Sequence, residues 1–142
     1  MRIASRSLRV AAVAGGLSLL VAGTAASDAA TATGTRTVTV VVHFSRYEPS
    51  SIQVRPGETV RFVVRNTDPI DHEFILGDEE VQRIHEEGTE AHHGEKPGEI
   101  SVPAGATVST TYTFPDQPGS LIFACHLPGH FDYGMRGTVT FG

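Results

Sequence analysis

Apolar and polar residues alternate through most of the chain from Arg36 onward. Alternation at every second position is typical of a β-strand with one buried face, and Pro–Gly pairs at 56–57 and 118–119 supply turns between such segments. Several short strands of this kind predict an all-β fold, an antiparallel sandwich or barrel. We expect strands around the apolar positions of 38–42, 52–54, 60–64, 100–102, 108–114, 121–125 and 139–141.

The alternation breaks off between residues 71 and 99, a stretch that holds ten of the 16 acidic residues and four of the 7 histidines. Asp78 can cap a helix, and the two glutamates after it suit a first helical turn. We therefore predict a short helix from 78 to about 87, followed by an irregular loop, in an acidic, His-rich insertion at 71–99. The apolar stripe expected for this helix is narrow and consists of Val81, Ile84 and Ala91.

Residues 1–26 differ from the rest, with a basic start followed by an apolar run of small residues from 10 to 26. This is the pattern of a secretory signal peptide. This run has 17 residues, diluted by Gly, Ser and Thr, and falls short of the ~20 of a membrane-spanning helix, so we expect cleavage rather than an uncleaved anchor. The product would be exported to the periplasm, the cell envelope or the extracellular space, without stable membrane insertion. Residues 27–36 read as a flexible lead-in and 37–142 as one domain.

Net charge and cysteine content argue against two classes of protein, nucleic-acid binders and disulfide-stabilised domains. After residue 26 the chain has 8 basic and 16 acidic residues, a formal charge of −8, which argues against a nucleic-acid partner. The single cysteine, Cys125, excludes an intrachain disulfide. Outside the cytosol a lone thiol oxidises or pairs with another chain unless it is buried or bound to a metal.

The residues around Cys125 favour a metal. His130 and Met135 follow it at five-residue intervals, Met135 is the only methionine after residue 26, and His72 comes after the predicted strand at 60–64. One thiolate, two imidazoles and one thioether form the ligand set of a blue-copper site, because the sulfur ligands suit Cu(I) and imidazoles suit both oxidation states. A buried inert thiol or a core methionine would explain each residue alone. A structural zinc site, the main rival, prefers more thiolates or histidines and no methionine.

Together with the segment YEPSSIQVRPGETVRF at 47–62, these residues resemble the cupredoxin family of blue-copper proteins, which includes plastocyanin, azurin and rusticyanin. The spacing of the loop ligands is similar to that of rusticyanin. The resemblance implies a Greek-key β-sandwich over 37–142 that holds one type 1 copper ion. It implies equatorial ligands His72, Cys125 and His130, and an axial ligand Met135. Glu73 departs from the family, which often has Asn or Ser after the first ligand histidine.

The pair Cys125–His126 also resembles the last ligand motif of multicopper oxidases. Those enzymes place another histidine before the cysteine, where this chain has Ala124. A trinuclear oxygen-reducing centre would therefore lack its ligands, and we expect His126 to point away from Cys125. Copper nitrite reduction needs a second, catalytic copper between domains. We therefore expect no enzymatic activity.

Further histidines leave a second metal ion open. The candidate accessory ligands are His85, His92, His93 and Glu90. If the segment is helical, Glu90 and His93 could share an ion, whereas His85 and His92 would stand ~10 Å apart along the axis. The alternative is a solvated acidic excursion that covers one flank of the sandwich. We read His43 as a strand-face residue.

Two functions follow from these observations. The first is single-electron transfer by Cu(II)/Cu(I) cycling to a redox partner with a basic docking surface, such as a cytochrome or a cuproenzyme. The resemblance to cupredoxins implies that the electron passes through the edge of His130. The alternative is copper binding, delivery or buffering in the envelope, with help from the His/Glu-rich insertion.

Overall fold

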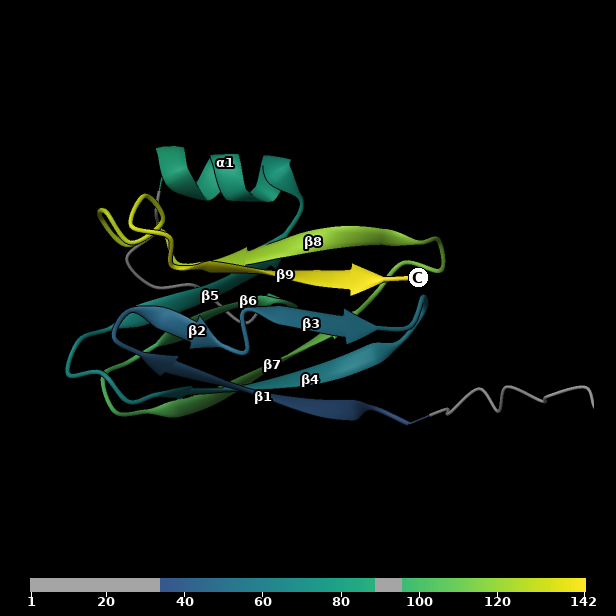
Figure 1. Ribbon diagram of the computed structural model, residues 1–142, viewed down its shortest axis with the longest axis horizontal. Coiled ribbons are helices and arrows are strands. Elements are labelled where there is room, and N and C mark those ends of the chain that lie inside the picture. The colour runs from purple at the N-terminus through teal and green to yellow at the C-terminus, as the bar shows by residue number, and fades with distance from the viewer. Residues whose placement is uncertain (1–33, 89–95) are drawn as a thin grey trace, which may run out of the picture. The chain divides into compact units, whose positions relative to one another are not determined.

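The computed structural model describes residues 34–88 and 96–142. In these residues it contains nine strands and one helix, arranged as two sheets that face each other (Figure 1). None of the helical segments described has the length and apolar character needed to cross a membrane. The predicted signal peptide lies outside the described residues, as do Glu90, His92 and His93.

The two sheets have four and five strands. In spatial order, the first contains β2 (Arg46–Glu48), β1 (Arg36–His43), β4 (Thr59–Asn66) and β7 (Thr107–Thr113). The second contains β3 (Ser51–Val54), β9 (Arg136–Phe141), β8 (Gly119–Ala124), β5 (His72–Gly77) and β6 (Glu99–Val102). This architecture confirms the predicted all-β sandwich.

One pairing expectation was wrong. The alternating pattern predicted an antiparallel sandwich or barrel, but β1 pairs with β4 in parallel and β3 pairs with β9 in parallel. Both pairs join strands that are not consecutive in the chain, with the intervening segments crossing between the sheets. A hairpin forces neighbours to run antiparallel, whereas such a crossover does not.

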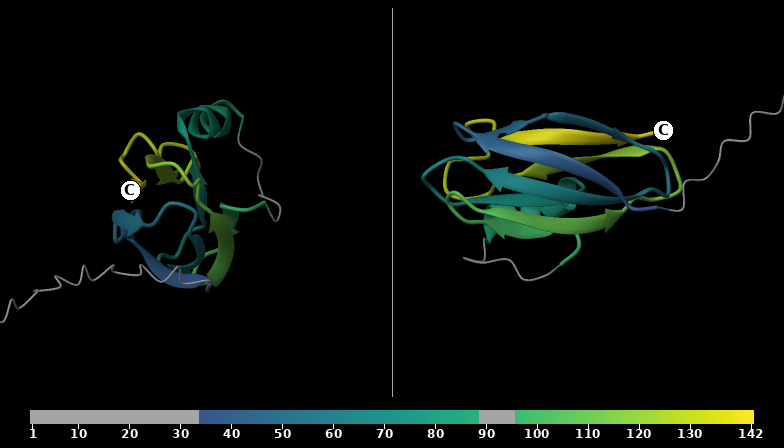
Figure 2. Two further views of the ribbon diagram at one scale, coloured as in Figure 1. Left: turned by 90° about the vertical axis from the view of Figure 1, so that its right-hand side faces the viewer. Right: turned by 90° about the horizontal axis from the view of Figure 1, so that it is seen from below.

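The apolar positions of the alternating segments face each other between the sheets. In β4, Val60, Phe62 and Val64 are fully buried while Arg61 and Arg65 are exposed. The same core includes Val40, Val42, Phe74, Phe114, Phe123, Val139 and Phe141. It also includes Cys125 and Met135, so the core reaches the end of the sandwich where loops 67–71 and 125–135 lie (Figures 1 and 2).

Strand β5 corrects the predicted insertion. Its six residues are all buried, because β6 and β8 flank it, the core lies on one face and helix α1 (Glu79–Glu87) on the other (Figure 2). A strand buried on both faces shows no alternation, so the sequence analysis placed it inside the interruption. Strand β5 ends at Gly77, and the next strand, β6, begins at Glu99.

Helix α1 confirms the predicted helix, and its N-cap Asp78 accepts a hydrogen bond from the backbone N–H of Val81 (3.0 Å). The predicted apolar stripe was wrong at Ile84; Val81 is half-buried, and Ala91 lies outside the described residues. Ile84 is 51% exposed, and the buried helix residues are Gln82 and His85. The inward face of α1 is polar because the surface beneath the helix is polar. That surface consists of backbone carbonyls of β5 and β8 and of His126, which need hydrogen-bond partners.

Candidate metal centre

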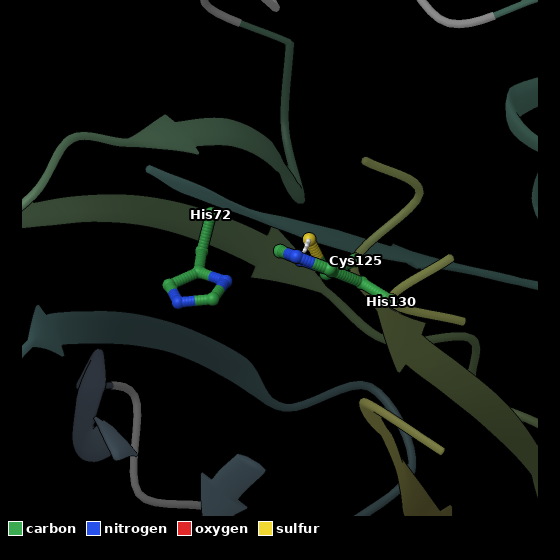
Figure 3. A group of neighbouring side chains, drawn as sticks. All are labelled: His72, Cys125 and His130. Carbon is green, nitrogen blue, oxygen red and sulfur yellow. Dashed lines mark hydrogen bonds between the residues drawn. The ribbon is translucent and has the colours of Figure 1, made fainter. Parts of the chain in front are cut away.

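Two segments distant in sequence supply the predicted ligands. His72 is the first residue of β5, Cys125 directly follows β8, and His130 lies in the loop that leads to β9. The structure brings these three side chains together (Figure 3), and their ligand atoms all lie within 4.8 Å of one another. Sγ of Cys125 is 3.2 Å from Nδ1 of His130. His72 and Cys125 are buried, whereas His130 is half-buried.

The two ring nitrogens of His72 have different surroundings. Nε2 lies 3.0 Å from Oδ2 of Asp68. Nδ1 is buried and has no hydrogen-bond partner among the described residues. An orphaned buried nitrogen costs free energy unless something binds it, and a second-shell carboxylate on the opposite nitrogen is typical of a metal-binding histidine. Nδ1 of His72 therefore fits a metal ligand.

Cys125 is held as a buried thiol. The backbone N–H of Glu73 donates to its Sγ (3.4 Å). Burial raises the pKa of the thiol to about 11, although hydrogen bonds from the backbone at Leu127 and Glu73 partly oppose this effect. Only the thiolate is a strong ligand, so a metal that binds here must displace a proton, and its own charge favours that loss.

His130 presents the neutral imidazole that a metal requires. Burial lowers its pKa, and the neighbouring His72 lowers it further. A neutral ring keeps a lone pair for coordination. One thiol and two imidazoles close together form a soft and borderline donor set, which suits copper.

Met135 is fully buried beside this group. Its carbonyl accepts a hydrogen bond from the N–H of Cys125 (3.2 Å), and its own N–H donates to the carbonyl of His130 (2.9 Å). Gly129 and Gly134 have positive φ values of 82° and 84°, a conformation that glycine adopts without steric cost and that lets the loop fold back tightly. The axial role of Met135 stays a prediction.

Among the described residues, His72, Cys125 and His130 form the one group of three or more His, Cys, Asp or Glu that could hold a metal ion. The candidate accessory ligand His85 lies on the buried face of α1, with Nδ1 2.7 Å from the carbonyl of Val81 and Nε2 3.5 Å from Glu99. His43 is exposed on β1 and lies 3.0 Å from Oγ1 of Thr67, as expected for a strand-face residue.

Asp68 was not predicted from the sequence as part of the site. Asp68 lies four residues before His72, and only this spacing could have pointed to it. His126 does face away from Cys125, as predicted, toward Gln82 and Glu86 of α1.

Comparisons with known proteins agree with this geometry. Residues 36–142 match the family described as copper-binding proteins of the plastocyanin/azurin family. The "copper-resistant cuproprotein CopI" of Rubrivivax gelatinosus is 43% identical over 109 residues, which is 73% of this chain and 65% of that protein. The protein of the same name from Pseudomonas aeruginosa is 29% identical, with 77% of each chain covered. The chain thus spans a little under two thirds of the first relative's length.

Solved structures show the same fold. Auracyanin B superposes with a TM-score of 0.62 at 22% identity, covering 75% of this chain and 88% of that one. Dithionite-reduced auracyanin from Roseiflexus castenholzii gives 0.63 at 22% identity, with 77% and 99% covered. The match across residues 36–142 and the converging Cys and His ligands place this chain in the plastocyanin/azurin family of copper-binding proteins.

Proposed function

We propose that the chain binds one type 1 copper ion at His72, Cys125 and His130, with Met135 as the axial ligand, and that it serves copper resistance outside the cytoplasm. The observation that carries the proposal is the buried, unpartnered Nδ1 of His72, on a residue that offers a ligand atom within 4.8 Å of those of Cys125 and His130. Copper supplies the chemistry of one-electron exchange at this position.

The relatives support the resistance role. Proteins from Rubrivivax gelatinosus and Pseudomonas aeruginosa carry the name copper-resistant cuproprotein. A buried set of preorganised ligands holds a metal tightly, which suits binding or buffering. We further propose that the protein is exported, consistent with the signal pattern at 1–26, and that it has no enzymatic activity.

Single-electron transfer is a second candidate, favoured by the surroundings of His130. This ligand is half-buried, Leu127 and Phe131 beside it are half-buried, and Pro128 is exposed. An apolar rim around a partly accessible ligand edge suits brief contact with a redox partner. The acidic chain would favour a basic partner such as a cytochrome or a cuproenzyme by raising the encounter rate.

Titration of the purified protein with Cu(II) tests the copper site. We expect one equivalent to produce the intense thiolate-to-copper absorption band and a type 1 EPR spectrum, and Cys125→Ser to abolish both. His43→Gln, which replaces an exposed histidine outside the cluster, is the matched control and should keep both. A titration without the band would refute the proposal.

Two further measurements separate the candidate functions. A resistance role predicts that the chain protects a copper-sensitive bacterial host and that Cys125→Ser does not. Electron transfer predicts a reversible one-electron couple and rapid exchange with a basic cytochrome, at rates that fall as salt is added. A redox-silent copper complex excludes the second candidate, and unchanged copper tolerance excludes the first.

A further inference from the structure

The residues that directly follow the four predicted ligands gather in one layer of side chains. In chain order they are Glu73, His126, Phe131 and Arg136; we refer to them as the follower layer. Neighbouring residues of an extended chain point to opposite sides. His126, which follows Cys125 at the end of β8, accordingly faces away from the metal site and contacts α1.

His126 lies at the centre of the follower layer and is almost completely buried. Its backbone N–H donates to Oε2 of Glu73 (3.2 Å). Its ring stacks on Phe131, with ring centres 5.0 Å apart and planes at 19°. The guanidinium of Arg136 lies 5.0 Å from the centre of the same Phe131 ring, a cation–π distance. His126 thus joins the segments that carry the ligands.

Helix α1 anchors His126 through Gln82. The side-chain amide N–H groups of Gln82 face the carbonyls of Ile75 (3.1 Å), Gly77 (3.4 Å) and Ile122 (3.0 Å). Three carbonyl acceptors fix the orientation of the amide, because its oxygen would be repelled there. Oε1 of Gln82 therefore points the other way and accepts a hydrogen bond from Nε2–H of His126 (2.7 Å).

Glu86, one turn further along α1, completes the contact. Its Oε2 lies 2.7 Å from Nδ1 of His126. Both ring nitrogens of His126 are therefore engaged by the helix, so the ring is not free to act as a ligand. Its remaining role is mechanical, since it connects α1 to the backbone beside Cys125.

We propose that His126 is a positioning residue for the copper site, held by Gln82 and Glu86 of α1. The inference rests on the proposed function. Through its N–H bond to the Glu73 side chain, His126 fixes the peptide of Glu73, whose own N–H donates to Sγ of Cys125. Glu73, Gln82 and His126 are buried, while the side chain of Glu86 is 47% exposed. Bonded polar groups in a buried network hold one geometry. Helix α1 thereby fixes the orientation of the thiolate.

The test compares His126→Phe with the unsubstituted protein, both loaded with copper. Phenylalanine keeps the ring and the stacking on Phe131 but removes both bonds to α1. We expect a shifted thiolate-to-copper band, altered EPR hyperfine splitting, and Cu(II) release to a chelator that is about tenfold faster, the size of many second-shell effects. His126→Gln, whose terminal amide can still donate toward Gln82, should restore part of the change.

Arg83→Ala is the matched control. Arg83 lies on α1 next to Gln82 but pairs only with the exposed Glu80 and Glu87 among the described residues. We expect this variant to lose helix stability without a change in band, EPR or release rate. The proposal would be overturned if both substitutions changed the band, the EPR spectrum and the release rate by amounts that simply followed the stability each one loses. His126 would then have only a general structural role.

A second variant and a copper-free measurement keep the test decisive. If His126→Phe fails to fold, Glu86→Ala leaves His126 in place and should shift the same signals in the same direction. In the copper-free protein, hydrogen exchange at the amides of Cys125 and His126 should accelerate in both variants relative to Arg83→Ala. A thiolate-to-copper band absent from the unsubstituted protein contradicts the proposed function. A band present there and unchanged in the variants contradicts this inference alone.

Discussion

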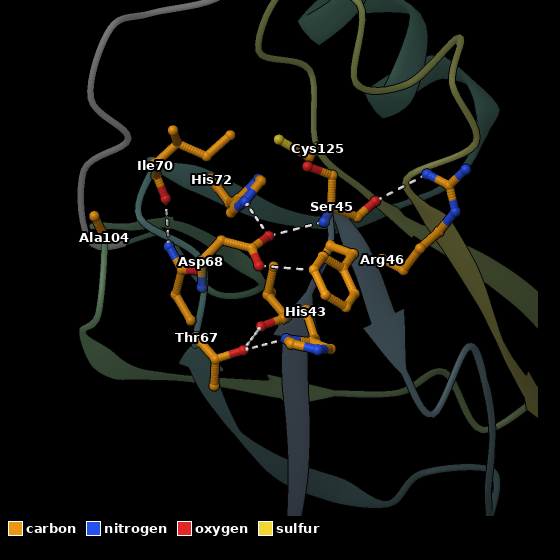
Figure 4. A network of polar contacts seen from close by, with 12 residues as sticks. His43, Ser45, Arg46, Thr67, Asp68, Ile70, His72, Ala104 and Cys125 are labelled. Atoms are coloured by element: carbon orange, nitrogen blue, oxygen red, sulfur yellow. Dashed lines mark hydrogen bonds and ion pairs between the residues drawn. The ribbon is translucent and has the colours of Figure 1, made fainter.

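Oδ2 of Asp68 lies 3.0 Å from Nε2 of His72 and also accepts the backbone N–H of Ser45 (2.8 Å). Oδ1 of the same carboxylate accepts the N–H of Phe44 (2.8 Å) (Figure 4). Burial by itself raises the pKa of Asp68, but the bonds from Ser45, Phe44 and His72 outweigh it, so the pKa lies below its ordinary value. One carboxylate thus orients His72 and holds a surface turn in which Phe44 and Ser45 both have positive φ.

Asp68→Ala should weaken copper binding about 10- to 100-fold, the usual effect of removing a second-shell carboxylate. The His72 ring loses the bond that directs Nδ1 toward the site, and two backbone N–H groups lose their acceptor. Competition with a chelator of known affinity measures the change. Asp71→Ala is the matched control, because this substitution removes the same charge. In the described structure, Asp71 accepts a hydrogen bond only from the N–H of Ala104. If both variants bind copper like the unsubstituted protein, Asp68 does not orient the ligand.

Substitution of Met135 tests its axial role. Met135→Leu should raise the reduction potential of bound copper, because loss of a donor in an apolar setting disfavours the more highly charged Cu(II). Met135→Gln should lower it, since an amide oxygen is a harder donor. Spectroelectrochemical titration measures both. If the unsubstituted protein and the two variants have the same reduction potential, Met135 is not a ligand of the copper ion.

Glu58 lies just before β4, at the opposite end of that strand from Asp68. We expect Glu58 to make the free energy of unfolding depend on pH. It accepts hydrogen bonds from Nε of Arg36 (2.7 Å) and the N–H of Arg55 (2.7 Å). Burial raises the pKa of Glu58, but these bonds outweigh burial and lower it from 4.5. Because the pKa of Glu58 is lower in the folded than in the unfolded state, its ionised carboxylate stabilises the fold at pH above the unfolded-state pKa. This stabilisation is lost as the pH falls through the folded-state pKa.

Glu58→Gln should therefore cost about 1–3 kcal/mol at pH 7 and flatten the loss of stability below pH 4.5. Urea unfolding of the copper-free protein at several pH values measures both effects. The type 1 spectrum should not change, because β4 separates Glu58 from the metal centre. If the free energy of unfolding changes with pH in the same way in Glu58→Gln and in the unsubstituted protein, Glu58 is not the source of the pH dependence.

Gly137→Ala should destabilise the fold by about 1–3 kcal/mol through overpacking. A Cβ at this position would lie 2.2 Å from the ring of Phe123 and 2.6 Å from the carbonyl oxygen of Ser50, closer than atoms can approach. Gly34→Ala is the control, since nothing described lies within 4 Å of the added Cβ. Thermal unfolding of both variants should separate them by several degrees.

Local patterns predicted much of this molecule. Alternation identified the apolar faces of β1, β4 and β9, because those strands have one buried and one exposed face. Asp78 marked the start of α1 correctly. The residue types and spacing of Cys125, His130 and Met135 indicated copper, since that donor set is chemically distinctive.

Other features could not be found in this way. Strand β5 is covered on both faces, so its sequence carries no alternation. The inward face of α1 is polar because it meets backbone carbonyls and His126, a surface that exists only once the sheet has formed. Likewise, the parallel β1–β4 pair depends on how the chain crosses between sheets.

The amino-acid order by itself determined which side chains can coordinate copper and which positions seek burial, because these follow from side-chain chemistry and short-range periodicity. Only the tertiary structure decided that Asp68 orients His72 and that Glu73, His126 and Phe131 meet under α1. Those contacts join residues from separate segments, and their partners are set by packing and long-range hydrogen bonds that local sequence does not encode.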